Sequence, residues 1–468
     1  MGRGKELAKN TGIIAMGKLS TQLISFLLLP LYTSILTTSE YGIVDLFTTY
    51  VQLLLPVATL MISQGAFRYL VDSKNDSERK KILTNAVAVI VVLLFFTTTV
   101  FCGIFLFWPN KYKIYLLVVL ITAALSDFVM QIARGFRKLH LYAVGGVITS
   151  TIQIILNVLF IAVLKLGPQG IFLATIIGNC SCLLVIGGRL KLYKYLELSS
   201  LSRGAIKDMF RYSIPLIPNQ LSFWIVNSSD RSIVKLFLGL EANGLLAVAH
   251  KFPNIFASLF HVFQLSWHEV GTVHFDDSDR DEFFSEAFHK VFLLFASLCI
   301  GIIAFLPLVF DLLVNQQYES AYTIIPIYMV AALINMVVGF LGVIYVATKK
   351  TLEISKTTII AGVVNVVIHM ALVNHIGLYA AAVSTLVSYL TVMIYRLYDT
   401  RKYVKIRFDI KSLSYTAITL FVVIGTYYSK QIISQVIGAI CAVVFALTAN
   451  RDTILQLFME CRRFIKKD

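Results

Sequence analysis

Charge is scarce in this sequence. Only 14% of its 468 residues are Asp, Glu, Lys or Arg, whereas 57% are apolar. Soluble domains carry about 25% charged and about 45–50% apolar residues, so both values indicate a membrane protein. The composition excludes a soluble enzyme, a disordered chain and a small secreted domain held together by disulfides.

Cysteine is also rare, and its pattern gives no sign of a redox or metal site. None of the six cysteines forms a C-x-x-C pair, and Cys180 and Cys182 lack further ligands nearby. We interpret the cysteines as small packing residues of apolar runs, and we expect no metal and no cofactor. The short basic start of the chain and the long apolar stretch after it do not match a secretory signal peptide.

Long apolar runs fill most of the sequence. A membrane helix needs about 20 apolar residues, and about fourteen runs reach that length. They cover residues 11–36, 44–67, 83–108, 114–133, 143–165, 169–188, 212–236, 243–266, 288–314, 322–347, 354–374, 377–397, 412–429 and 432–449. The loops between them are too short for a folded soluble domain. We therefore predict an all-α, polytopic membrane protein with about fourteen transmembrane helices.

The basic residues predict the orientation of these helices. The net charge is +15, and with a cytoplasmic N-terminus about 33 of the 41 Lys and Arg fall in inner loops and tails. Clusters such as Arg79-Lys80-Lys81 and Lys349-Lys350 lie on that side, whereas the outer loop around Glu40 has none. We predict that both chain ends are cytoplasmic. Because the charges are spread over many short segments, we expect no nucleic-acid binding.

Three pairs of similar segments recur at nearly the same spacing, about 202 to 212 residues. The pairs are Glu40-Tyr41-Gly42 with Glu241-Ala242-Asn243-Gly244, Gly170 to Ala174 with Gly377 to Ala381, and Arg137-Lys138 with Lys349-Lys350. They predict two six-helix lobes of the same orientation. The predicted domains are residues 1–200, residues 201–405, and residues 406–468 with two further helices and a basic tail.

Polar side chains recur on one face of four predicted spans. A charge at mid-bilayer costs about 2.5–3.5 kcal/mol on insertion scales, so such residues mark a transport pathway. The faces are Lys18, Gln22 and Ser25 in span 1; Thr49, Gln52, Pro56 and Thr59 in span 2; Gln220, Trp224, Asn227 and Arg231 in span 7; and Lys251, Asn254, Ser258 and His261 in span 8. We predict that these spans line a shared water-filled cavity.

The charges in the predicted cavity are mainly positive. Lys18, Arg231 and Lys251 are balanced chiefly by Asp127 and Asp230. A cationic cavity suits an anionic cargo, above all a phosphate, and the amide and hydroxyl side chains suit sugars. Each residue also has a structural interpretation. Lys18 can extend to the membrane surface, Asp230-Arg231 can be a structural ion pair, and His261 can be a packing residue.

Several motifs carry a family resemblance. They are Lys9-Asn10-Thr11, Leu29-Pro30-Leu31-Tyr32-Thr33, Ser39-Glu40-Tyr41-Gly42, Tyr212-Ser213-Ile214-Pro215-Leu216-Ile217-Pro218, Asp230-Arg231, Gly239 and Gly244. Through them the chain resembles the Wzx-type polysaccharide flippases of the multidrug/oligosaccharidyl-lipid/polysaccharide exporter superfamily. The resemblance implies two lobes in a V-shaped bundle, alternating access, and outward flipping of undecaprenyl-diphosphate-linked units in the bacterial plasma membrane.

The resemblance also implies where the cargo binds. Basic residues of spans 1, 2, 7 and 8 hold the diphosphate in this family, which corresponds here to Lys18, Arg68, Arg231 and Lys251. The similar lipid II flippases carry more arginine in span 1, so the single Lys18 argues against a peptidoglycan precursor. A teichoic-acid-type precursor stays an alternative cargo.

We therefore predict a non-enzymatic flippase. Its predicted substrate-binding residues are Lys18, Gln22, Gln52, Arg68, Gln220, Asn227, Arg231, Lys251 and Asn254, and its candidate proton or sodium sites are Asp127, Asp230 and His261. The expected partners are the lipid-linked glycan, membrane lipids and glycan-assembly proteins, with the chain acting as a monomer. The rival interpretations are a drug/cation antiporter of the same superfamily, a lipid-linked glycan polymerase or ligase, and a membrane scaffold.

Overall fold

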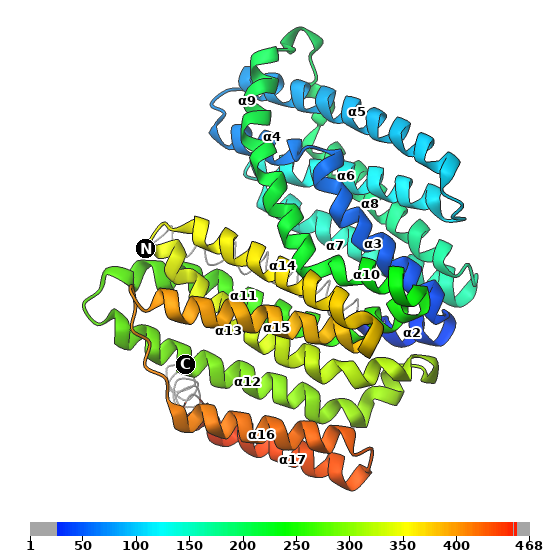
Figure 1. Ribbon diagram of the computed structural model, residues 1–468. Helices are drawn as coiled ribbons and strands as arrows, with labels where there is room; N and C mark the ends of the chain where they lie inside the picture. The colour runs from blue at the N-terminus through cyan, green and yellow to red at the C-terminus, as the bar shows by residue number, and fades with distance from the viewer. Residues whose placement is uncertain (1–25, 453, 456–468) are drawn as a thin grey trace, which may run out of the picture. The chain divides into compact units, whose positions relative to one another are not determined.

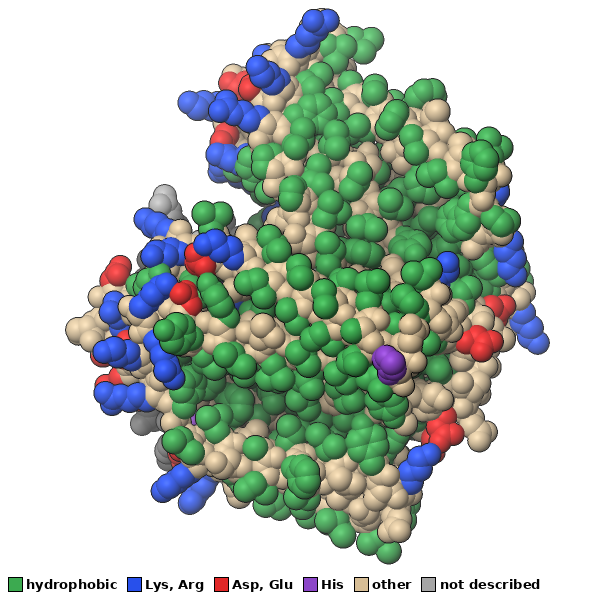
Figure 2. All heavy atoms as spheres, in the orientation of Figure 1, with side chains coloured by type: hydrophobic (Ala, Val, Ile, Leu, Met, Phe, Trp, Pro, Cys, Tyr) green, Lys and Arg blue, Asp and Glu red, His purple; other side chains and the backbone are tan. Residues whose placement is uncertain are grey.

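The computed structural model describes residues 26–452, 454 and 455, and within them every regular element is a helix. Twelve helical segments of this described part are long and apolar enough to cross a membrane. Figure 2 shows apolar side chains over the helix shafts and Lys and Arg side chains toward the helix ends. These features confirm the predicted all-α, polytopic membrane protein.

The chain forms two compact units, Met1–Lys235 and Leu236–Asp468. The described helices of the first unit are α2 (Leu29–Ile35), α3 (Thr38–Ala58), α4 (Ile62–Asp72), α5 (Asp76–Phe107), α6 (Lys113–Gly135), α7 (Leu139–Asn157), α8 (Pro168–Leu190) and α9 (Arg203–Ser213) (Figure 1). Helix α10 (Ile217–Ala249) begins in the first unit and ends in the second.

The second unit continues with seven helices among its described residues. They are α11 (Lys251–Val273), α12 (Arg280–Leu313), α13 (Ile325–Ala347), α14 (Thr351–Ile376), α15 (Tyr379–Thr400), α16 (Ile410–Tyr428) and α17 (Ile432–Ala449). Helix α13 packs against α11 and α15, while α16 and α17 pack against α12. The predicted lobe boundaries at residues 200 and 405 stay a prediction.

The predicted span 44–67 is two helices, α3 and α4. Helix α3 starts earlier, at a capping box in which the Glu40 amide donates to Thr37 Oγ1 at 3.2 Å and the Thr37 amide donates to Glu40 Oε2 at 3.1 Å. It ends just after Pro56, and Leu60 and Met61 have φ of 45° and 53°. The apolar run continues through this break, so composition gave no sign of it.

The predicted spans 212–236 and 243–266 also have different ends in the structure. The segment α10, residues 217–249, consists of two helices that meet at a kink at Gly239, where φ is 88° and ψ is −177°. A glycine adopts this conformation without a Cβ clash. The kink lies in the gap between the two predicted spans. Helix α11 then begins at Lys251, and it is not among the twelve apolar spans because its sequence is more polar.

The first predicted span, 11–36, lies largely outside the described residues. Its described part contains α2, which begins beside Pro30. When α11 is added to the twelve apolar helices, every run predicted from residue 44 onward corresponds mainly to helix in the structure.

One predicted repeat pair shows the same local backbone in both units. Arg137 and Lys349 each have φ 58°, in the left-handed region. The next residues, Lys138 and Lys350, donate their amides to the carbonyls five residues earlier at 2.9 and 2.8 Å. The two helices therefore end in the same way, and the internal repeat stays a prediction.

Candidate functional site

Arg231 of α10 forms a buried ion triad within the first unit. Its Nε lies 3.1 Å from Asp45 Oδ2 of α3, and its Nη1 lies 3.0 Å from Asp230 Oδ1. Arg231 is 7% exposed and Asp230 is 4% exposed. The guanidinium thus contacts two carboxylate side chains, one from α3 and one from its own helix. The triad matches the structural interpretation of Asp230-Arg231 and adds Asp45, which the sequence patterns did not indicate.

A second contact joins α3 and α10 next to this triad. Trp224 Nε1 donates to the Thr49 carbonyl at 2.9 Å, and the Thr49 hydroxyl donates to the Asp45 carbonyl at 2.8 Å. Thr49 is buried, as are Pro56 and Thr59 further along the chain. The predicted polar face of span 2 is therefore partly packed inside its own unit, and the Trp224 side chain of span 7 contacts it.

Asp127 of α6 lies in a separate polar network. Ser63 Oγ of α4 donates to Asp127 Oδ2 at 2.6 Å, and Gln131 Nε2 donates to Asp127 Oδ1 at 3.1 Å. Arg134 continues the chain by donating to Gln131 Oε1 at 2.7 Å, and its guanidinium lies 4.5 Å from the ring centre of Phe67. Two neutral groups thus donate to the carboxylate of Asp127. The cation Arg134 is linked to it only through Gln131.

These hydrogen bonds fix the orientation of the Asp127 side chain. Asp127 is half-buried, and Ser63 and Gln131 each donate to one of its carboxylate oxygens. Asp127, Gln131 and Arg134 follow one another at i, i+4 and i+7 on a single helix face. This spacing is visible in the sequence and could have indicated the three residues that α6 contributes to the network.

Arg396 of α15 is a buried cation of the second unit that was missed. It is 5% exposed, and it donates to Thr357 Oγ1 from Nε at 3.2 Å and from Nη2 at 2.6 Å. Its Nη1 donates to the Val338 carbonyl at 2.8 Å, and its guanidinium lies 5.8 Å from the ring centre of Tyr345. Arg396 falls at the end of the predicted span 377–397, where a basic residue resembles the start of an inner loop.

The remaining predicted residues are mostly accessible. Lys18 and Gln22 lie outside the described residues. Lys251 is half-buried, and the exposed ones are Gln52, Arg68, Gln220, Asn227, Asn254 and His261. Arg68 pairs with Asp72 one turn away on α4. The structure brings Asn227 together with Arg231, whose Nη1 donates to the Asn227 carbonyl at 3.1 Å. The assignment of all these residues to the cargo or to a coupling ion stays a prediction.

Metal binding has no support among the described residues, since none of their His, Cys, Asp and Glu side chains gather in groups of three or more able to hold an ion.

Comparisons with known proteins bear on the family and the fold. The family model described as polysaccharide biosynthesis protein matches residues 7–264 of this chain. A comparison with curated proteins gives no match. Among solved structures, an inward-facing multidrug resistance MATE family transporter of the MOP superfamily is 16% identical, with a TM-score of 0.69. The match covers 83% of this chain and 97% of that one.

Two further structures extend this likeness. The lipid II flippase MurJ, in an inward closed conformation, is 16% identical with a TM-score of 0.68, covering 94% of this chain and 99% of that one. A MOP superfamily transporter from Pyrococcus furiosus, reported to have a binding pocket of reverse polarity, is 16% identical with a TM-score of 0.57. The match covers 84% of this chain and 95% of that one. These likenesses show that the chain has the fold of this superfamily.

Proposed function

Because this chain belongs to the polysaccharide biosynthesis protein family, we propose that it is a flippase for a lipid-linked oligosaccharide. The family match carries the proposal. The chain also has the same fold as a lipid II flippase, which supports a lipid-linked cargo. The proposed cargo is an undecaprenyl-diphosphate-linked glycan or a teichoic-acid-type precursor. It moves by alternating access from the inner to the outer leaflet of the bacterial plasma membrane, without a chemical reaction.

The chain's own residues take different parts in this proposal. The basic side chains of Lys18, Arg68 and Lys251 bind the diphosphate, since Lys and Arg satisfy phosphate oxygens with charge-assisted hydrogen bonds. The exposed amides Gln52, Gln220, Asn227 and Asn254 donate to and accept from the hydroxyls of the glycan.

Arg231 acts in the proposal as a switch between two partners. In the structure it is held by Asp45 and Asp230 at 3.1 and 3.0 Å. Protonation of one carboxylate weakens its hold on the guanidinium, which then turns to the cargo phosphate. Loss of the cargo on the other side of the membrane returns Arg231 to its carboxylates. The switch links proton uptake to cargo binding without a nucleotide.

A drug/cation antiporter is the second candidate. The observation in its favour is the pair of carboxylates, Asp45 and Asp230, that contact the one guanidinium of Arg231 in the first unit. A carboxylate released from Arg231 attracts a cation instead of a phosphate. The fold is common to both candidates, since a MATE family transporter has it too.

The two candidates differ in what a cell without the gene lacks. For the flippase, we expect loss of a surface polysaccharide and accumulation of its lipid-linked precursor in the inner leaflet, both restored by the intact gene. Unchanged surface polysaccharide together with new sensitivity to cationic drugs would overturn the flippase and support the antiporter. Because loss of Arg231 also destabilises the fold, Arg231→Ala is compared at equal amounts of protein in the membrane, where it should behave like the deletion. Lys356→Ala serves as the control because Lys356 is exposed and pairs with Glu353.

A further inference from the structure

Helix α9 lies on the first unit as an anchored surface helix. The segment before it is tied to α5, where Asn85 Nδ2 donates to the Ser200 carbonyl at 2.9 Å and the Ser202 amide donates to Asn85 Oδ1 at 2.8 Å. Lys80 pairs with Glu197 at 3.1 Å in the same segment, and the hydrogen bond from Lys80 holds the pKa of Glu197 below its usual range. Helix α9 therefore has a fixed place beside α5.

The inner face of α9 packs closely on α4. Met209 is 1% exposed and Ser213 is fully buried. A Cβ at Gly65 of α4 would lie 2.9 Å from the Met209 carbonyl oxygen, so only glycine allows this approach. Tyr69 of α4 adds a hydrogen bond from its hydroxyl to the Asp208 carbonyl at 3.2 Å. With one face fixed in this way, the opposite face of α9 is constantly presented to the outside.

That outer face consists of two adjacent ridges. Arg203, Lys207 and Arg211 follow at i, i+4 and i+8, and all three are exposed. Among the residues that the structure describes, none forms an ion pair with any of these three cations. The second ridge is apolar and contains Ile206, Phe210 and Ile214 at the same spacing. Ile206 and Phe210 are half-buried and also pack against the core of the first unit, whereas Ile214 is exposed.

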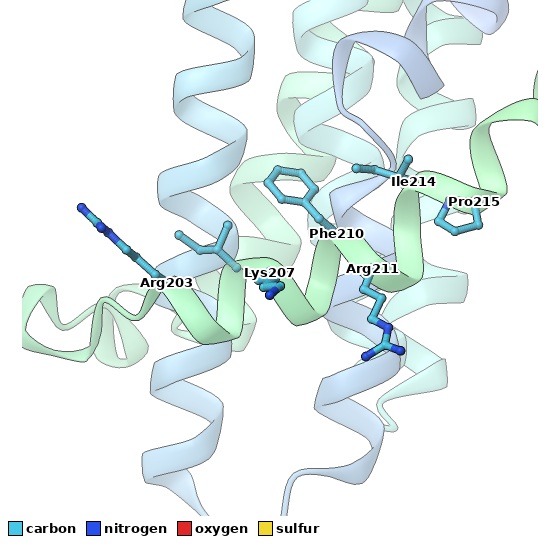
Figure 3. Close-up of a pocket in the computed structure, with 7 residues that line it drawn as sticks. Arg203, Lys207, Phe210, Arg211, Ile214 and Pro215 are labelled. Carbon is cyan, nitrogen blue, oxygen red and sulfur yellow. The ribbon is translucent and has the colours of Figure 1, made fainter.

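The two ridges line a single open groove. Its volume is about 650 Å³, and its lining residues are Arg203, Ile206, Lys207, Phe210, Arg211, Ile214 and Pro215. Figure 3 shows that all the labelled residues come from α9 and the turn after it, with Phe210 and Ile214 on the upper side of the helix, Arg203 extending from its start and Arg211 extending downward. Cationic and apolar surfaces therefore meet along one line.

The other side of α9 has the opposite sign. A smaller groove of about 340 Å³ there is lined by Asp72, Glu78 and Asp208, with Lys81 as its single cation among the lining residues. The positive charge of α9 is thus confined to the side that carries the apolar ridge. A general excess of basic residues in this region would not separate the charges in this way.

We propose that the groove of α9 binds anionic phospholipids of the membrane leaflet on its own side. The headgroup phosphates lie along Arg203, Lys207 and Arg211, and the upper parts of the acyl chains lie on Ile206, Phe210 and Ile214. A basic ridge beside an apolar one is the surface that suits the boundary between headgroups and acyl chains. Helix α9 also directly precedes the long helix α10, whose residues 227–249 form one of the twelve apolar spans.

The spacing of the cations favours phospholipids over the diphosphate of the proposed cargo. Arg211 lies eight positions after Arg203 on the helix, which corresponds to about 12 Å along the axis. All three cations come from one ridge, so they form a row and do not converge on one point. A row suits several monophosphate headgroups side by side, whereas a single diphosphate requires cations from several directions.

The test uses the purified full chain in a neutral detergent, titrated with phosphatidylglycerol and with phosphatidylcholine, with bound lipid counted by native mass spectrometry. We expect the intact protein to retain phosphatidylglycerol over phosphatidylcholine. The triple variant Arg203→Gln/Lys207→Gln/Arg211→Gln should bind phosphatidylglycerol about 100-fold more weakly, at about 1 kcal/mol per basic residue. Arg203→Lys/Arg211→Lys keeps the charge and should keep the binding.

The matched control removes the same charge from the preceding segment. Arg189→Gln/Lys191→Gln/Lys194→Gln changes three exposed residues outside the groove and should retain most of the bound phosphatidylglycerol. Equal loss in both triple variants, or no loss in the first, overturns the site. A third titration uses farnesyl diphosphate, and its preferential retention over phosphatidylglycerol by the intact groove overturns the phospholipid assignment in favour of a cargo-type ligand.

Discussion

The guanidinium of Arg231 lies 3.1 Å from the carboxylate of Asp45, a residue 186 positions earlier in the chain. This single contact joins α10 to α3 inside the first unit and gives a buried cation a second anionic partner beyond its neighbour Asp230. The sequence predicted Arg231 as a ligand for the cargo, whereas in the structure its charge is already balanced by carboxylates. Both the stability and the proposed coupling of the protein depend on this balance.

Replacing Arg231 should destabilise the protein strongly. Arg231→Met leaves Asp45 and Asp230 close together without their cation, and breaking a buried pair costs about 3–5 kcal/mol. We expect a clear fall in the thermal unfolding temperature of the purified protein, measured in detergent. Adding Asp45→Asn and Asp230→Asn to the same variant should recover most of the loss.

The exposed pair Arg68–Asp72 provides the comparison for Arg231. Both of its side chains are more than two-fifths exposed, so Arg68→Met should cost about 1 kcal/mol or less. If Arg231→Met lowers the unfolding temperature no more than Arg68→Met does, the triad does not stabilise the fold.

Asp127→Asn should separate coupling from stability. In the intact protein Ser63 Oγ donates to Asp127 at 2.6 Å. The amide oxygen of the variant can still accept this hydrogen bond, but the amide cannot take up a proton. We expect the variant to reach the membrane at normal levels while cargo flipping in vesicles no longer responds to a pH gradient. Flipping that responds to the gradient as in the intact protein would remove Asp127 from the coupling mechanism.

Lys251→Ala should weaken cargo binding. One charge-assisted hydrogen bond contributes about 1.5–3 kcal/mol, which corresponds to about 10–100-fold in affinity. We expect a loss of this order in the binding of a prenyl-diphosphate-linked sugar to the purified protein, and Lys251→Arg should restore most of it. Equal affinity of Lys251→Ala and the intact protein would exclude Lys251 from the cargo site.

Arg396 should be irreplaceable even by lysine. Its Nε and Nη2 both donate to Thr357 Oγ1, and its Nη1 donates to the Val338 carbonyl, a fork that one ammonium group cannot reproduce. We expect Arg396→Lys to lower the free energy of unfolding by about 1–3 kcal/mol, the cost of unsatisfied buried groups. The measurement is thermal unfolding, and an unchanged unfolding temperature in Arg396→Lys would contradict the role given to the fork.

Composition and periodicity predicted the fold class, because apolar length is the dominant requirement of a membrane helix. They did not predict the end of α3, because Leu60 and Met61 are apolar and yet have positive φ. Asp45 was missed because it stands one residue inside the predicted span 44–67, where a charge looks like the end of a span. Its partner, 186 residues away, leaves no periodic signal in either helix.

Two glycines stand at helix ends near one of the predicted repeat pairs. Gly167 directly precedes α8, and Gly377 directly follows α14. Their φ angles of 60° and 56° strongly favour glycine. The sequence match pairs Gly377 with Gly170, which lies inside α8, so these two corners do not test the predicted repeat.

Arg137 and Lys349 show a different solution at comparable corners. Their left-handed backbone, with φ of 58°, costs about 1–2 kcal/mol for a residue with a side chain, and glycine would avoid that cost. Both positions nevertheless carry charges that contribute to the predicted orientation in the membrane. Glycine at these two positions would therefore favour the local backbone, but it would remove two of the charges that direct how the chain inserts into the membrane.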